Sequence, residues 1–254
     1  MPKGILYLVA TPIGNLGDIT YRAVETLKAS SCVIAEDTRV TRVLLDRYSV
    51  KTRLLSFHKF NELDRVSSVI KMLEEGEIVS LVSDAGTPLV SDPGAALVRE
   101  CVEKGFDVQC LPGPSSALAA LVLSGFDISH FYFFGFLSKK ENERRQQLLV
   151  LPSFGCPVVI FESPNRVKET LAEISEELVD PPVCVAKELT KIHEKVIRGS
   201  ASQVMRLITD EMLRGEYVIV VDASSITAAQ KKEKPGAEEL VAKYINQGMD
   251  RKEA

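Results

Sequence analysis

The sequence predicts an α/β protein of two units, with a largely parallel sheet in the first unit and a mixed sheet in the second. Over 1–123, apolar runs alternate with segments of helical period, which is typical of parallel strands joined by helices. Over 124–223, two apolar runs follow each other directly at 182–189 and 193–200, which indicates an antiparallel pair. The 254 residues suffice for two domains, and 224–254 remain as a tether and the start of a small helical extension.

In the first unit, apolar runs bounded by turn residues predict the strands, and amphipathic segments predict the helices. The segment 61–75 shows the helical period most clearly, because its apolar residues recur every three or four positions, Asn61 can cap its start and Gly76 can end it. The expected strands are 5–10, 32–36, 53–57, 77–82 and 107–111, and the expected helices are 20–29, 38–47, 61–75, 93–104 and 115–123.

The second unit follows a connection at 124–131, and a charged segment rich in small residues at 224–235 predicts a flexible tether after it. Apolar residues between Leu240 and Ile245 then share one face of an amphipathic helix. The expected strands of this unit are 131–136, 157–161, 182–189, 193–200 and 216–223, and the expected helices are 140–150, 164–178 and 201–213.

The composition is that of a soluble globular protein, with 45% apolar and 26% charged residues. The net charge of −4 argues against a generally basic nucleic-acid binder, although local basic patches remain compatible with it. The five cysteines stand singly without a CxxC pair, which favours reduced buried thiols. The apolar run at the N-terminus is too short for a signal peptide or a membrane span, so we expect a cytoplasmic protein with no membrane partner.

Four expected strands of the first unit end in loops rich in Gly, Pro, Asp and Ser. Such residues are ordinary turn formers, and one such loop would need no other explanation. Four of them at the same edge of a parallel sheet indicate a ligand crevice, because ligands bind at the carboxyl ends of the strands. The loops are ATPIGNLGDIT (10–20), EDTR (36–39), SDAGTPLVSDPG (83–94) and PGPSSA (112–117).

The usual phosphate-binding and nucleophile motifs are absent, since the sequence contains no GxGxxG, GxxxxGK[ST] or GxSxG. The three histidines, at 58, 130 and 193, are too scattered for a metal site. The remaining polar groups in the loops are carboxylates, above all Asp84 and Asp92, together with small hydroxyls and accessible backbone. They suit a cationic ligand rich in amide and hydroxyl groups better than a polyphosphate.

Eight motifs in order, VATPIGNLGDIT, EDTR, SFHKFNE, LVSDAGTPLVSDPG, PGPSSALAAL, FFGFLSKK, FESPNRV and KELTK, resemble those of the RsmI family of ribosomal RNA small-subunit methyltransferases. This resemblance implies a two-domain tetrapyrrole-methylase-like fold with S-adenosylmethionine bound between the domains and no metal. It also implies a homodimer that methylates the ribose 2′-hydroxyl of a cytidine in the decoding region of 16S rRNA, in the small ribosomal subunit.

The resemblance implies that the loops of the first unit and two strands of the second hold the methyl donor, with Asp84 accepting hydrogen bonds from its amino-acid end. The implied donor-binding residues are Pro12, Ile13, Gly14, Asp84, Ala85, Gly86, Ser115, Ser116, Ala117, Phe161, Glu162 and Ala223.

A base near the hydroxyl would assist the transfer, and Glu36, Asp37 and His58 are the candidates. The alternative is that the residues of EDTR form a structural ion-pair network at a strand end. Cations could position RNA through its phosphates without reading sequence. The candidates are Arg39, Lys139, Lys140, Arg144, Arg145, Arg166, Lys187 and Lys191, with Lys195 beside the last two.

The chain departs from the family pattern at Asn165, where a His is more usual, and at Lys187, where an Arg is more usual. A lysine loses the bidentate phosphate geometry of arginine. Two other functions stay open: a methyltransferase for corrinoid or porphyrin precursors, and a non-catalytic RNA-binding module in ribosome assembly. TPIGN and SDAGTP weigh against the first, and the full set of donor loops weighs against the second.

Overall fold

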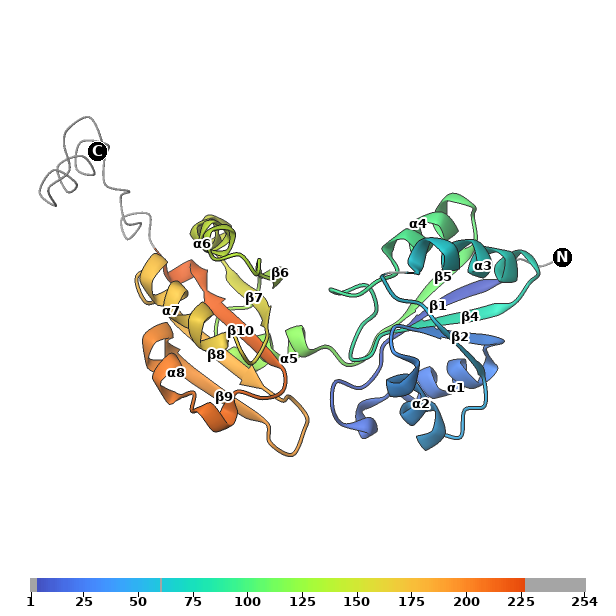
Figure 1. Ribbon diagram of the computed structural model, residues 1–254, viewed down its shortest axis with the longest axis horizontal. Helices are drawn as coiled ribbons and strands as arrows, with labels where there is room; N and C mark the ends of the chain where they lie inside the picture. The colour runs from blue at the N-terminus through green and yellow to red at the C-terminus, as the bar shows by residue number, and fades with distance from the viewer. Residues whose placement is uncertain (1–3, 60, 227–254) are drawn as a thin grey trace, which may run out of the picture.

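The computed structural model of the protein describes residues 4–59 and 61–226, which form two α/β lobes (Figure 1). Every strand and helix expected in the first unit is present, with ends that differ by a few residues. The elements of the first lobe are β1 (Ile5–Val9), α1 (Tyr21–Ala29), β2 (Cys32–Ala35), α2 (Thr38–Arg47), β3 (Arg53–Ser56), α3 (Glu62–Glu74), β4 (Ile78–Val82), α4 (Ala95–Glu103) and β5 (Asp107–Leu111).

The first sheet has the strand order β3-β2-β4-β1-β5, and all its pairs are parallel, which confirms the prediction. One face is covered by α3 and α4 through Leu73 and Leu97, and the other by α1 and α2 through Leu27 and Leu45. Because β2, β4, β1 and β5 are neighbours and run the same way, the loops that follow them meet along one edge of the sheet.

The second sheet has the order β6-β7-β10-β8-β9 and is mixed, as predicted. β6 and β7 run parallel, whereas β10 runs antiparallel to β7 and β8, and β9 antiparallel to β8. The elements of the second lobe are α5 (Ser116–Ser124), β6 (Tyr132–Phe136), α6 (Glu141–Leu149), β7 (Pro157–Glu162), α7 (Val167–Glu177), β8 (Pro182–Lys187), β9 (Lys195–Ser200), α8 (Ala201–Leu207) and β10 (Tyr217–Asp222).

The helix expected at 201–213 is shorter in the structure. It ends at Leu207, and a separate 3-10 turn follows at Asp210–Met212. Two β-branched residues in succession, Ile208 and Thr209, explain the break, because they lose side-chain freedom in a helix. From residue 227 onward, the predicted tether and terminal helix lie outside the described residues.

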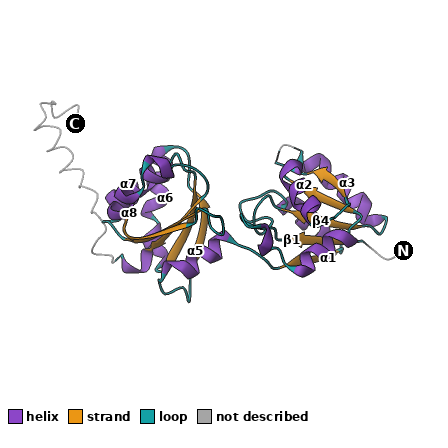
Figure 2. Cartoon of the chain, turned by 90° about the horizontal axis from the view of Figure 1, so that it is seen from below, coloured by secondary structure: helices purple, strands orange, loops and turns teal. Residues whose placement is uncertain are grey.

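α5 packs against the second sheet, although the sequence placed it in the first unit. Ala117, Ala120 and Leu121 are buried in a cluster with residues of β7, β8 and β10. Figure 2 shows α5 on the opposite side of this sheet from α6, α7 and α8. We therefore propose that the second domain begins just before α5 rather than after it. No helix in the described part of the chain is both long and apolar enough to cross a membrane.

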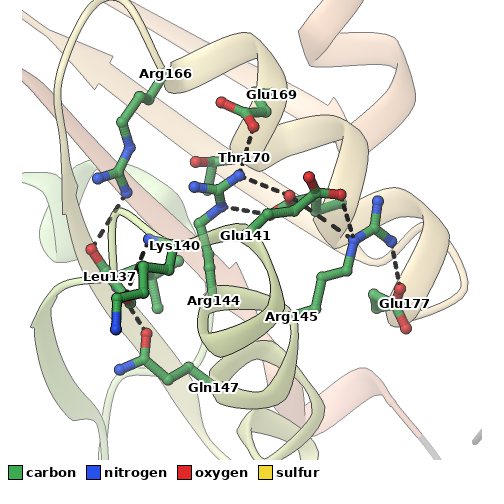
Figure 3. Close-up of polar contacts among 12 residues, drawn as sticks. Leu137, Lys140, Glu141, Arg144, Arg145, Gln147, Arg166, Glu169, Thr170 and Glu177 are labelled. Atoms are coloured by element: carbon green, nitrogen blue, oxygen red, sulfur yellow. Dashed lines mark hydrogen bonds and ion pairs between the residues drawn. The ribbon is translucent and has the colours of Figure 1, made fainter.

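Arg144 is the largest of the most deeply buried side chains, and it joins α6 to α7 (Figure 3). Its Nε donates to Glu173 over 2.6 Å, and its Nη2 donates to Glu169 over 2.6 Å and to Glu173 over 2.7 Å. The hydrogen bonds to Glu173 hold the pKa of Arg144 above its ordinary value. The interpretation of Arg144 as an RNA contact is therefore wrong, since its side chain is 2% exposed and its guanidinium is paired with Glu169 and Glu173.

Two neighbouring cations are also committed to carboxylates. Arg145 lies 3.2 Å from Glu141 and 2.5 Å from Glu177, and Lys140 lies 2.7 Å from Glu143. The run of basic residues in this part of the sequence is thus largely neutralised by glutamates of α6 and α7. Sequence proximity of the cations alone could not reveal these partners on the neighbouring helix.

We expect Arg144→Met to lower the free energy of unfolding by ~3–5 kcal/mol, because it leaves the buried Glu173 carboxylate without its partner. Urea denaturation monitored by circular dichroism measures this change. The matched control Lys140→Met removes an exposed ion pair of the same helix and should leave the midpoint almost unchanged. Equal effects of the two substitutions would contradict a structural role for Arg144.

Candidate active site

A cavity of about 420 Å³ lies between the two lobes, at the carboxyl edge of the first sheet. The first lobe contributes Ile13, Glu36, Asp84 and Asp92 to its lining, with Ser116 at the start of α5. The facing lobe contributes the ends of β6 and β7 and the start of β10. These residues of the second lobe are Phe136, Phe161, Glu162, Ser163, Pro164, Ala186, Glu188, Leu189, Gly215, Glu216, Tyr217 and Val218.

A second cavity of about 340 Å³ adjoins the first, and both are lined by Ile13, Asp84 and Ala85. This cavity also reaches Pro12 and Gly14, and residues of α2 line one side of it. The loops after β1 and β4 therefore separate two hollows that open on either side of Asp84.

Three hydrogen bonds hold these two loops together. The Thr11 N–H donates to Gly86 O over 2.9 Å, the Gly86 N–H returns to Thr11 O over 3.0 Å, and Thr11 Oγ1 donates to Ser83 O over 2.9 Å. Gly86 has φ +90°, and a Cβ there would lie 3.3 Å from the Ile13 side chain. A glycine is needed at this position because an L side chain would strain the backbone and press on the cavity wall.

The carboxylates of the loop after β4 are fixed from within the first lobe. Asp84 Oδ1 accepts a hydrogen bond from the Asp37 N–H over 3.0 Å, and the Ser83 hydroxyl donates to Asp92. Leu89 and Ser91 in the same loop have φ of +70° and +67°. Backbone in this region is strained for residues other than glycine, and the surrounding contacts must hold it.

Three carboxylates at the cavity have raised pKa values. Burial is the main cause of the raised pKa of Glu36, and repulsion by Asp92 and Asp84 adds to it. Burial likewise raises the pKa of Asp84 and of Asp92, against the hydrogen bonds from Asp37 and Ser83. The cavity therefore concentrates negative charge in partly dry surroundings and favours a cationic ligand.

The three predicted base candidates have different surroundings. Asp37 caps α2 and pairs with Arg39, whose Nη2 lies 2.6 Å from its Oδ2, and these hydrogen bonds lower the pKa of Asp37 to about 2. The interpretation of EDTR as an ion-pair network thus describes Asp37 and Arg39. Glu36 lines the cavity and accepts no hydrogen bond from the described residues. His58 is outside the lining but lies close enough to oppose the rise in the pKa of Glu36.

The wall formed by the second lobe depends on Glu162, whose side chain is fully buried. Its carboxylate accepts hydrogen bonds from Ser163 N over 2.7 Å, Arg166 Nη2 over 2.9 Å and Thr170 Oγ1 over 2.7 Å. Arg166 Nη2 also donates to Leu137 O over 3.2 Å, just past the end of β6 (Figure 3). Arg166 thus ties the ends of β6 and β7 together, and the Glu162 carboxylate is occupied by protein donors.

Ala223 does not reach the cavity. β10 runs antiparallel to β7, so Tyr217 at its start pairs with Glu162 while Asp222 at its end pairs with Pro157. Ala223 is buried in the core at the far end of the sheet. The donor-binding assignment of Ala223 is wrong, and the start of β10 takes its place. The glycine before this strand, Gly215, was the available sequence signal.

Three more expected residues, Lys187, Ser115 and Ala117, are absent from the lining of the cavity. Lys187 is buried, with 9% of its surface exposed, on the opposite face of β8 from Ala186, so the expected RNA contact at Lys187 is also wrong. Ser115 caps α5 by accepting from Leu118 N over 3.4 Å, and Ala117 lies in the apolar cluster beneath α5.

The lobes meet at the loop 188–194. The Asn15 N–H donates to Thr190 Oγ1 over 3.1 Å, and a Cβ on Gly14 would overlap the side chain of Lys191. Lys191 lies 2.9 Å from Glu188 and 3.0 Å from Glu216. Glycine at position 14 thus lets the first lobe approach Lys191 closely, and the ion pairs hold this lysine in the lining of the cavity of about 340 Å³.

Comparison with known proteins agrees with this arrangement. A family profile described as tetrapyrrole (corrin/porphyrin) methylases matches residues 5–205. The ribosomal RNA small subunit methyltransferase I of Bacillus subtilis is 41% identical over 255 residues, covering 99% of this chain and 87% of that protein. The protein of the same name from Thermotoga maritima is 44% identical over 218 residues, covering 86% of this chain and 98% of its own.

The chain belongs to the ribosomal RNA small subunit methyltransferase I family, within the tetrapyrrole methylases. The resemblance in the eight motifs is therefore confirmed. The fold prediction is confirmed as well, since a diphthine synthase structure matches with a TM-score of 0.71 at 17% identity, covering 88% of this chain and 92% of that one. Identity this low compares the folds alone.

S-adenosylmethionine is the methyl donor of this family, and the observed cavity fits it. Three carboxylates, Glu36, Asp84 and Asp92, line the cavity and suit the positively charged donor. Burial is the main cause of their raised pKa values, and repulsion between carboxylates adds to it. Phe136 and Phe161, with ring centres 5.6 Å apart, give the cavity an apolar wall. In the described part of the chain, no group of three His, Cys, Asp or Glu residues is arranged to hold a metal.

We expect Gly86→Ala to reduce the affinity for S-adenosylmethionine about tenfold, equivalent to ~1.4 kcal/mol, because the new Cβ displaces Ile13 and the bridge to Thr11. Isothermal titration calorimetry measures the affinity. Gly125→Ala is a matched control, since Gly125 has φ +78° and open space around it. Both variants should lose ~1–2 kcal/mol of stability from the strained φ, but only Gly86→Ala should weaken donor binding.

Glu36→Gln should make the free protein more stable than the wild type, and the gain should grow with pH. The pKa of Glu36 is raised on folding, so the folded state binds more protons than the unfolded state and stability falls as pH rises towards the folded-state pKa. Urea denaturation of both proteins at several values between pH 4 and 8 measures this difference. A constant difference over this range would rule out the raised pKa.

Proposed function

We propose that the protein methylates the ribose 2′-hydroxyl of a cytidine in the decoding region of 16S rRNA, with S-adenosylmethionine as donor. The observation that carries this proposal is the pair of hollows on either side of Asp84, in a chain of the small-subunit rRNA methyltransferase family. The inner hollow, between the lobes, holds the donor. The outer hollow, along α2, admits the nucleotide that is methylated.

The donor is held by residues of both lobes. Asp84 and the backbone of Ala85 receive its polar end, Ile13 and Phe161 cover its apolar parts, and Gly86 keeps the loop in place. When bound, S-adenosylmethionine supplies a methyl group that leaves a positively charged sulfur, which keeps the electron pair as a neutral thioether. The chain must therefore place the hydroxyl in line with that methyl group and take up its proton.

Glu36 is the base in this proposal. It lines the donor cavity, no described residue donates a hydrogen bond to it, and its raised pKa brings it closer to neutral pH than an ordinary glutamate. Asp37 is a weaker candidate because its pKa is about 2 and its carboxylate is engaged by Arg39. His58 lies close enough to Glu36 to oppose the rise in the pKa of that carboxylate.

Among the candidates for RNA contact, Lys139, Arg39, Lys140 and Lys191 keep accessible side chains, and the last three also form ion pairs. Lys139 is exposed in the loop before α6, and Lys191 lies at the rim of the cavity with 29% of its side chain exposed. Arg166 acts on RNA only indirectly in this proposal, by holding the wall. A homodimer in the cytoplasm, acting on the small ribosomal subunit, completes the function that the motif resemblance implies.

The test uses S-adenosylmethionine with a labelled methyl group and small ribosomal subunits that lack this modification. Label in a single cytidine ribose, located by mapping of 2′-O-methylation, would establish the function. Free 16S rRNA and a tetrapyrrole precursor serve as parallel acceptors. Label in the precursor alone would replace the proposal by the tetrapyrrole alternative, and failure to bind the donor would refute it.

We expect Glu36→Gln to lower kcat by ~10²–10⁴-fold, the usual contribution of a general base, while the affinity for the donor stays within a few-fold. The acidic limb of the kcat–pH profile should disappear in this variant. Single-turnover methylation of small subunits over pH 5 to 8 provides both results. Glu25→Gln, on the exposed side of α1, is the control and should match the wild type. An unchanged profile for Glu36→Gln would show that another group, or no group, takes the proton.

A further inference from the structure

The outward face of α2 combines unpaired positive charge with exposed apolar side chains. Arg42 and Arg47 are exposed, and neither forms an ion pair or side-chain hydrogen bond with the described residues. Val40 and Val43, on the same helix, are 48% and 61% exposed. This face is not needed for packing, since α2 contacts the sheet through Leu44 and Leu45 on its other side.

The charge on α2 is net positive. The helix contains three arginines and one acid, Asp46. Arg39 is held by Asp37, which caps the helix, whereas Arg42 and Arg47 keep their charge available. By contrast, the cations of α6 are neutralised by glutamates. In an acidic chain, α2 is therefore a local site for an anionic partner.

Three hollows follow one another along α2. Val40 and Val43 line the outer cavity that contains Asp84. Arg42 lines a hollow of about 430 Å³ near the start of the helix. At the other end, Arg47 lines a groove of about 740 Å³.

The wall of that groove facing Arg47 belongs to the second lobe. It contains Ile192, which is 98% exposed, and His193. The groove therefore runs between the lobes beside the outer cavity, and it offers both a cation and apolar surface. An extended polymer bound along α2 would therefore contact the surfaces of both lobes.

The spacing along the helix suits a nucleic-acid strand. Arg42 and Arg47 are separated by ~7.5 Å along the axis at 1.5 Å per residue, comparable to the spacing of neighbouring phosphates in an extended strand. At 3.6 residues per turn they also differ by ~140° in direction around the axis, so a strand that contacts both arginines crosses the outward face obliquely. Val43 lies between them along the axis and Val40 just before Arg42, and both valines line the cavity with Asp84. A nucleotide there would have its phosphates near the arginines and its sugar against apolar side chains.

We propose that the outward face of α2 is the docking surface for a single-stranded rRNA segment, with Arg42 and Arg47 binding the phosphates that flank the target nucleotide and Val40 and Val43 packing against its sugar. This inference rests on the proposed function, because it places the acceptor of the same site. Charge complementarity favours RNA over a protein partner, and a single strand can turn one nucleotide out into a cavity.

The first experiment measures the affinity of the donor-saturated protein for small ribosomal subunits at several salt concentrations. For the double variant Arg42→Ala/Arg47→Ala, we expect affinity to fall by about an order of magnitude and the slope of log Kd against log[salt] to decrease by about 2, one for each lost phosphate contact. Donor affinity should not change. Unchanged subunit affinity, or an unchanged slope, would overturn the proposal.

The control is Arg99→Ala/Arg206→Ala, which removes two exposed arginines from α4 and α8 that also have no ion-pair partner among the described residues. It should retain the wild-type affinity and slope. If this control loses as much affinity, the effect is one of total charge and the proposal fails.

Val40→Ser/Val43→Ser tests the apolar contact. It should raise KM for subunits several-fold with the salt slope unchanged, because no phosphate contact is removed. An unchanged KM would refute the packing of Val40 and Val43 against the sugar.

A photo-crosslinker in place of Val43, p-benzoylphenylalanine, identifies the partner directly. Crosslinks to rRNA near the methylated nucleotide support the proposal, whereas crosslinks to a ribosomal protein, or none from a variant that still binds subunits, overturn it. The wild-type methylation assay separates this outcome from the function itself. If the wild type methylates rRNA but α2 fails these tests, only the docking surface is wrong.

Discussion

The bridge between Thr11 and Gly86 is the contact on which the site depends. It joins the loops after β1 and β4, which carry most of the residues of the first lobe around both cavities. The bridge requires β1 and β4 to be parallel neighbours, since only then do their following loops lie at the same edge of the sheet. It also requires glycine at position 86, because the left-handed backbone brings the two main chains together beside Ile13. The sheet order thus determines where the donor cavity can form, and a single glycine allows the loops to close it.

The second lobe forms its side of the donor cavity with a buried polar network. Its wall is held by a buried carboxylate, Glu162, that is satisfied entirely by protein donors, with Arg166 joining two strand ends. A buried charge of this kind costs free energy unless every lone pair has a partner, so the network specifies one arrangement of the wall. The first lobe instead places Glu36 in the cavity, where no described residue donates a hydrogen bond to it. One lobe thus provides a rigid wall, and the other provides a carboxylate, Glu36, that can act on a ligand.

The sequence predicted the first lobe well because its elements follow local patterns. Strand ends, caps and turn residues are readable from neighbouring positions, and the four loops were expected at one edge for that reason. What depended on distant pairing was predicted less well. The prediction for Ala223 was wrong because the sequence of β10 does not show whether the strand runs parallel or antiparallel to β7. The prediction that Arg144 contacts RNA was wrong because its partners, Glu169 and Glu173, lie on another helix.

The position of α5 also depends on packing that the sequence does not show. Its sequence is apolar on nearly every face, so its period could not tell which sheet it covers, and the structure places it on the second. The exposed valines and arginines of α2 could not be predicted as a docking surface. The helical period shows which face of the helix is buried, but not which cavities border the opposite face. The site residues that the sequence could predict were those in glycine-rich loops. The positions of the other site residues depend on packing between helices and strands that are distant in the sequence.

The non-glycine residues with positive φ at the site carry a cost in backbone strain. Leu89 and Ser91 lie in the loop of the first lobe, and Glu188 and Thr190 in the facing loop of the second, so strained backbone borders the cavity on both sides. Glycine at these positions would relieve the strain in the folded chain but would also free the loops in every state. Substitutions that raise the thermal stability of this enzyme by relieving backbone strain in these loops would thus also make the loops less rigid. Improvements in robustness are better sought in α6, α7 and the far end of the second sheet, away from the donor.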